Sequence, residues 1–193
     1  MDDVAASLME VARLREGIRV VVREAARINL DAINSMIKAR MVGKQAMGFS
    51  VSSSELRRFA LQLNAIMDRL TAEIRQEVKD TAALLVLAKK VRYHHRAAHS
   101  TRRRRERLLE LIEAKKEESA RFLAAVEQGQ RRLNLSLRQA ARICQVGLSV
   151  TRSSKIESAY SGSLSRELRQ VSDVIEERIE GLFSTVKAMA SRR

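Results

Sequence analysis

The chain contains no proline, few glycines and few aromatic residues. Its 193 residues include no Pro, 7 Gly, 4 Phe, 2 Tyr and no Trp. Pro ends helices, Gly weakens them and aromatic residues favour strands, so this composition excludes a turn-rich β-sheet protein. The length is sufficient for one domain or one extended bundle. We therefore predict an all-α protein.

The sequence also lacks a second cysteine and any long apolar run. Cys144 is the only cysteine, so an internal disulfide is excluded. Its place in a helical stretch favours a buried, inert thiol over a reactive one. No apolar run approaches the roughly 20 residues that cross a bilayer. Asp2 and Asp3 stand where a secretory signal would carry positive charge. A reducing cytoplasm is the expected location.

Motifs of enzymes, cofactor sites and metal sites are not found. The chain has no phosphate-cradling Gly loop, nucleophile elbow or paired-carboxylate site. His95 and His99 have the i, i+4 spacing of metal-binding helices. The surrounding arginines would repel a cation, so exposed histidines are the favoured interpretation. We predict neither catalysis nor a bound cofactor or metal.

Apolar residues recur at steps of three and four along the chain, which is the spacing of coiled coils and helical bundles. This spacing predicts a helix from Val4 to Met41 and a second one that Ser53 or Ser54 would cap. A third helix is predicted from Ser100 or Thr101 to about 160, and a fourth from there to the end. The predicted turns are 42–53, with Gly43 and Gly48, and a shorter one near Gly162.

The two halves of the chain align without a gap at an offset of 162 − 43 = 119 residues, which matches Gly43 with Gly162. Bundle periodicity alone produces some apolar matches, but a matched glycine at the turn favours a tandem duplication over coincidence. The apolar matches are Leu14 with Leu133, Ile18 with Leu137, Ile37 with Ile156, Phe49 with Leu168, Leu56 with Ile175, Leu63 with Leu182, and Met67 with Val186.

Two hairpins in one chain predict a long antiparallel four-helix coiled-coil bundle made of two fused helical hairpins, with a two-helix extension. The first hairpin is expected at 1–95 with its tip near 42–53. The second is expected at 96–193 with its tip near 161–164. Both would belong to a single elongated helical domain, 1–193. A monomeric pseudo-dimer is favoured over a homodimer, because one chain already holds both hairpins.

A spaced set of residues surrounds the first turn: Asn34, Ile37, Ala39, Gly43, Gly48, Phe49, Val51, Glu55 and Arg57. The segment from Lys155 to Gly162 repeats part of it. Both resemble the cytoplasmic signalling tip of bacterial methyl-accepting chemotaxis receptors, in which N-x-x-I-E-A-A-R-A-G-E is followed by G-F-x-V-V-A-x-E-V-R. The resemblance implies a non-enzymatic signalling or scaffold protein. It would act through protein contacts at its tips, and chemotaxis-type signalling components are the partners that the resemblance implies.

The resemblance also places a set of partner-binding residues at the two tips. Four of them, from Lys38 to Met47, replace the family's residues with side chains of different charge, so the surface that would engage a histidine kinase is altered. The resemblance therefore implies an inherited scaffold more than inherited kinase control. The methionines form either an adaptable docking surface or ordinary packing. The full set is Asn34, Lys38, Met41, Lys44, Met47, Phe49, Glu157 and Tyr160.

Positive charge is concentrated in one segment of a chain whose net charge is +14. Residues 89–107 contain nine Lys or Arg and one acid, which is 9 − 1 = +8. Three interpretations remain open: a solvated connection, an anionic partner such as nucleic acid or anionic lipid, and an acidic protein. The alternative function is therefore a basic coiled-coil module that binds nucleic acid or anionic membrane. Tyr93 alone makes a poor base-stacking platform. The densest part is Arg102, Arg103, Arg104 and Arg105.

Overall fold

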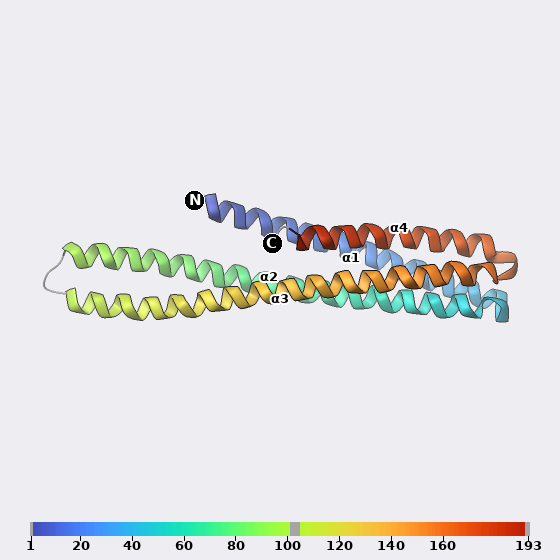
Figure 1. Ribbon diagram of the computed structural model, residues 1–193, viewed down its shortest axis with the longest axis horizontal. Coiled ribbons are helices and arrows are strands. Elements are labelled where there is room, and N and C mark those ends of the chain that lie inside the picture. Colours follow the sequence, from blue (N-terminus) through green and yellow to red (C-terminus); the bar gives the residue numbers. More distant parts are fainter. Residues whose placement is uncertain (1, 101–104, 192–193) are drawn as a thin grey trace. The chain divides into compact units, whose positions relative to one another are not determined.

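The computed structural model describes residues 2–100 and 105–191, with side chains from 9 to 98 and from 105 to 191. The described elements are α1 (Asp2–Val42), η1 (Gly43–Ala46), α2 (Met47–Ser100), α3 (Arg105–Ala159), η3 (Gly162–Leu164) and α4 (Ser165–Ala190). Without proline, α2 and α3 run for 54 and 55 residues. The predicted all-α class and antiparallel helix packing are confirmed (Figure 1). None of the described helices is long and apolar enough to cross a membrane.

The helices are divided between two compact units, where the sequence pattern predicts one elongated domain. Unit 1 comprises Met1–Thr71 and Leu135–Arg193, and unit 2 comprises Ala72–Asn134. Unit 1 therefore contains α1, α4 and the segments of α2 and α3 that adjoin η1 and η3. Unit 2 contains the other segments of α2 and α3. The two units differ in how many large apolar side chains they bury.

The core of unit 1 repeats at the offset that aligns the two halves of the sequence. We call two residues equivalent when they are separated by that offset. Equivalent positions are buried together, because apolar spacing of three and four turns the same face of each helix inward. Buried equivalent pairs include Ile18 and Leu137, Ala25 and Cys144, Phe49 and Leu168, Leu56 and Ile175, Leu63 and Leu182, and Met67 and Val186.

Each turn of unit 1 contains a glycine with positive φ. Gly43 has φ +84° and Gly162 has φ +59°, a region that residues with a Cβ rarely adopt. A short 3₁₀ helix begins at each glycine. A Cβ at Gly162 would lie 2.6 Å from Gln45 Oε1, so the two turns are neighbours.

The first turn is shorter than the predicted span 42–53, because α2 begins at Met47. The predicted cap residue Ser53 instead lies inside α2 and is buried. The early start has a packing reason. Phe49, in the first turn of α2, closes the end of the core with Ala39, Ala46 and Leu168.

Unit 2 has a thin core. Its described side chains bury few large apolar residues, and one carboxylate is buried beside them. Gln76 Nε2 donates a hydrogen bond of 2.9 Å to Asp80 Oδ1, which satisfies that carboxylate in part. The buried apolar residues of unit 2 are Ile74, Leu87, Ala98, Ile112 and Leu133.

Candidate protein-contact site at the two helical turns

Large apolar side chains are exposed around both turns of unit 1. Met41 is 81% exposed and Tyr160 is 72% exposed, and these two residues are equivalent in the repeat. Clustered apolar exposure of this kind is typical of interaction surfaces. The other members of the cluster are Ile37, Met47, Val51 and Ile156.

On α1 these side chains continue a second stripe, which we call the outer seam: the apolar residues Leu30, Ile37 and Met41, with the polar residue Asn34 among them. All four are exposed, and their spacing of four, three and four residues places them on one face. The core positions Ala32, Ser35 and Ala39 lie on another face and are buried. The equivalent residues of α3, namely Ser149, Ser153, Ile156 and Tyr160, are exposed as well. Such spacing is that of a coiled-coil contact surface.

A groove of about 350 Å³ lies beside the outer seam, between α1 and α4. Its lining includes two polar atoms, Asp31 Oδ2 and Ser35 Oγ, that are buried and have no hydrogen-bond partner in the described part of the chain. A buried polar group without a partner is costly, so this groove can accept a donor from outside. The lining residues are Asp31, Asn34, Ser35, Ile37, Lys38 and Val171.

Ion pairs join α1 to α4 beside this groove. Arg178 Nη1 lies 3.0 Å from Glu24 Oε2, and Arg178 Nε lies 3.7 Å from Asp31 Oδ2. Nearer the turns, Lys38 Nζ lies 3.1 Å from Glu167 Oε2. Arg178 is half-buried, whereas the Lys38 pair is exposed, so the Arg178 pair is less screened by solvent.

The junction between α2 and α3 occupies the equivalent positions with different chemistry. Phe59, equivalent to Arg178, packs on Gly147, where an added Cβ would lie 2.9 Å from Phe59 Cε2. The carboxyl group of Glu157, equivalent to Lys38, lies against Gly48, and Gly48 is equivalent to Glu167. One junction is thus ionic and the other depends on close approach to glycine.

Serine hydroxyls also differ between the two halves. Ser154 Oγ and Ser172 Oγ lie 2.9 Å apart and are buried. Their equivalents, Ser35 and Ser53, are buried without a hydrogen-bond partner in the described residues. The first half therefore carries two unsatisfied hydroxyl groups at positions where the second half has a hydrogen-bonded pair, and one of the two, Ser35 Oγ, lines the groove.

Most residues predicted at the tips are accessible. Lys38 lies at the groove, and Glu157 is half-buried against Gly48. The prediction that Phe49 binds a partner is wrong. Phe49 is 1% exposed and packs in the core, so it cannot contact a partner directly. Ile156 is exposed but was not among the predicted tip residues, although the repeat offset relates it to Ile37. The accessible predicted residues are Asn34, Met41, Lys44, Met47 and Tyr160.

Two titratable groups of unit 1 have shifted pKa values. Burial raises the pKa of the Cys144 thiol to about 12, so the thiol stays protonated near neutral pH. Hydrogen bonds to Asp173 and Glu176 raise the pKa of Lys155. The pairs of Lys155 with Asp173 and Glu176 join α3 to α4. Within the described residues, no group of three His, Cys, Asp or Glu side chains is placed to hold a metal ion.

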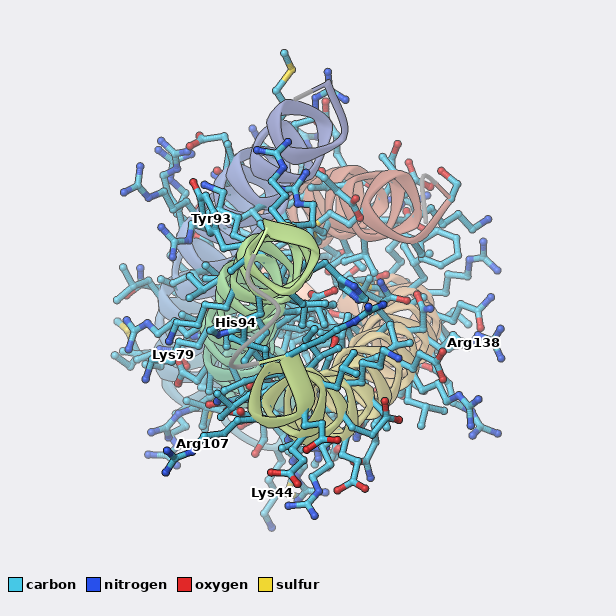
Figure 2. The ribbon with its side chains drawn as sticks, turned by 90° about the vertical axis from the view of Figure 1, so that its left-hand side faces the viewer. Lys44, Lys79, Tyr93, His94, Arg107 and Arg138 are labelled. Carbon is cyan, nitrogen blue, oxygen red and sulfur yellow. The ribbon has the colours of Figure 1, made fainter. Side chains whose placement is uncertain are left out.

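The basic segment lies only partly within the described residues. Arg102, Arg103 and Arg104 lie outside them, whereas Arg105 begins α3 and is exposed. In unit 2, a groove of about 240 Å³ is lined by Lys89, Arg92, Tyr93 and Arg96. Tyr93 is drawn on α2 in Figure 2, with Arg107 on α3. This groove is a second candidate surface, and its lining is basic.

Comparison of the chain with protein-family models, with curated proteins and with solved structures gives no match. The resemblance to receptor tips therefore stays a prediction, and the function has to be argued from the geometry of the chain itself.

Proposed function

We propose that this chain is a non-enzymatic signalling or scaffold protein that binds partner proteins at the outer seam beside its two turns. The carrying observation is the exposure of equivalent apolar residues in both halves, Ile37 with Ile156 and Met41 with Tyr160. A partner supplies an amphipathic helix whose apolar face lies along the seam. Chemotaxis-type signalling components are the partner class that the tip resemblance suggests.

The architecture proposed for this role is a pseudo-dimer within one chain, favoured over a homodimer of hairpins, in which two fused hairpins form a four-helix bundle and α2 and α3 supply a two-helix extension. The unlike junctions support pairing within one chain. If two copies of the second hairpin paired with each other, Glu157 would face Glu167 instead of Gly48. Arg178 would then face Gly147 and lose the carboxylates of Glu24 and Asp31. Like charges and an unpaired half-buried cation disfavour that homodimer.

The groove between α1 and α4 gives the binding surface a polar component. A donor side chain from the partner helix would satisfy Ser35 Oγ, which has no hydrogen-bond partner in the described residues. Apolar contacts along the seam then supply affinity, and the groove sets the register of the partner. On α3 the residue equivalent to Asp31 is the apolar Val150, so only α1 offers a carboxylate at this position. A partner helix would therefore be held in one register at α1.

The test is capture of partner proteins from the source cell by the full chain and by variants. Ile37→Lys combined with Ile156→Lys places charge on the outer seam of α1 and at the equivalent position of α3, and we expect loss of every specifically captured protein. Leu61→Lys is the matched control, because Leu61 is exposed on α2 away from the turns. Circular dichroism should show unchanged helix content in both variants. Equal capture by the wild type and the double variant would reject the proposal.

A further inference from the structure

The outward face of α2 in unit 2 combines basic and apolar side chains. Lys89, Arg92 and Arg96 follow at steps of three and four, opposite the buried positions Leu87 and Ala98. The same face exposes Leu85, Val86 and Tyr93, which is 68% exposed and points away from α3 (Figure 2). No Asp or Glu occurs from 81 to 100. We call this surface the basic face.

The outward face of α3 in unit 2 is acidic. Glu106, Glu110, Glu113 and Glu117 are exposed at steps of four, three and four, so they form one stripe. The stripe turns away from the buried residue Ile112, and Leu109 is exposed beside it. Lys116 Nζ neutralises Glu113 at 3.1 Å, whereas Glu110 and Glu117 form no ion pair within the described part of the chain. We call this surface the acidic face.

We propose that unit 2 binds a second copy of this chain, with the acidic face of one molecule on the basic face of the next. The two faces are complementary in charge and both expose leucines. Each lies on the side of its helix turned away from the other helix, so one molecule cannot join its own two faces. The contact is head-to-tail, and it repeats unless rotation closes a ring.

The thin core of unit 2 also favours a second copy as occupant. Long helices derive most of their stability from packing of an apolar face, and unit 2 leaves Leu85, Val86 and Leu109 exposed. A nucleic acid would engage Lys89 and Arg92 but would leave these apolar side chains uncovered. A second copy covers them and neutralises both stripes at once.

The experiment compares full-length variants by sedimentation velocity across salt concentrations. At low salt the wild type should exceed its monomer mass of 21.8 kDa, and the association should weaken at high salt. Lys89→Glu with Arg92→Glu reverses the basic face, and Glu110→Lys with Glu117→Lys reverses the acidic face. Each double variant alone should associate at least about tenfold more weakly than wild type.

Mixing the two reversed variants supplies the decisive result. Each variant then offers the other a complementary face, so an equimolar mixture should regain association. Arg138→Glu with Arg142→Glu reverses two exposed charges of α3 in unit 1, and this control should associate like wild type. A monomer at every salt concentration overturns the proposal, as does a mixture that stays dissociated. Duplex DNA bound by a chain that never self-associates assigns the basic face to nucleic acid and also overturns it.

Discussion

At the scale of single residues, glycines decide where helices come into close contact. Gly147 admits the ring of Phe59, and Gly17 admits the Met189 thioether, whose Sδ would lie 2.5 Å from an added Cβ. Gly181 faces open space, with nothing within 4 Å of its added Cβ. The same residue type therefore has opposite consequences for packing at different positions of one chain.

Gly147→Ala should destabilise the protein, because Phe59 is buried and its ring cannot swing into solvent. We expect a cost of about 1–3 kcal/mol in the free energy of unfolding, typical of overpacking. Gly181→Ala is the control and should stabilise by about 0.5–1 kcal/mol through helix propensity. Urea denaturation of both variants measures the difference. Equal effects of the two substitutions would contradict close α2–α3 packing at Gly147.

At the scale of helices, the two junctions hold different chemistry at equivalent positions. Arg178 meets Glu24 and Asp31 at the α1–α4 junction, whereas its equivalent Phe59 meets Gly147 at the α2–α3 junction. The equivalents of Glu24 and Asp31 are Ile143 and Val150, so these carboxylates occur only at the junction that holds the cation. The two halves therefore differ in these contacts, although their buried positions coincide.

Arg178→Ala should cost about 2–3 kcal/mol, because it leaves the carboxylates of Glu24 and Asp31 half-buried without their cation. Lys38→Ala removes the exposed pair with Glu167 and should change stability by less than about 0.5 kcal/mol. Thermal unfolding with a double-mutant cycle of Arg178→Ala and Glu24→Ala measures the coupling. A larger loss from Lys38→Ala than from Arg178→Ala would refute this ranking.

At the scale of the molecule, buried apolar residues are unevenly distributed between the units. Equivalent positions of unit 1 supply matched core residues along its helices, whereas unit 2 buries few apolar side chains in its described part. Local opening is easiest where few apolar contacts resist it. Unit 2 is therefore the less stable part of the chain and gains most from a second copy.

Native-state hydrogen exchange should show this difference directly. In high salt, where association is weak, amides of residues 72–134 should exchange faster than those of unit 1. Lower salt should slow exchange in unit 2 selectively, because a second copy would cover its faces. Mass spectrometry of peptides from each unit measures the rates. Uniform protection in high salt would contradict the uneven core.

The sequence predicted the helices and the turn glycines Gly43 and Gly162, because apolar spacing and positive-φ glycine are local signals. The predicted first turn was too long: Gly48 lies inside α2, and Ser53, which looks like a cap residue, is buried there. The sequence assigned Phe49 to the surface, because a tip resemblance does not show which side of the helix is covered. It missed Ile156, although the repeat offset relates it to Ile37.

The sequence by itself determined that this chain forms long helices, where they turn and at what offset they repeat. Apolar spacing of three and four without proline is sufficient to predict the helices, and two glycines are sufficient to predict the turns. Both signals act over a few residues of backbone. Only the tertiary structure decided which apolar stripe is covered and which is left exposed. It also brought Arg178 to Glu24, 154 residues away in the chain. Which stripe of α1 is covered depends on helices that are distant from it in the sequence. Local apolar spacing therefore cannot distinguish the core face of α1 from its outer seam.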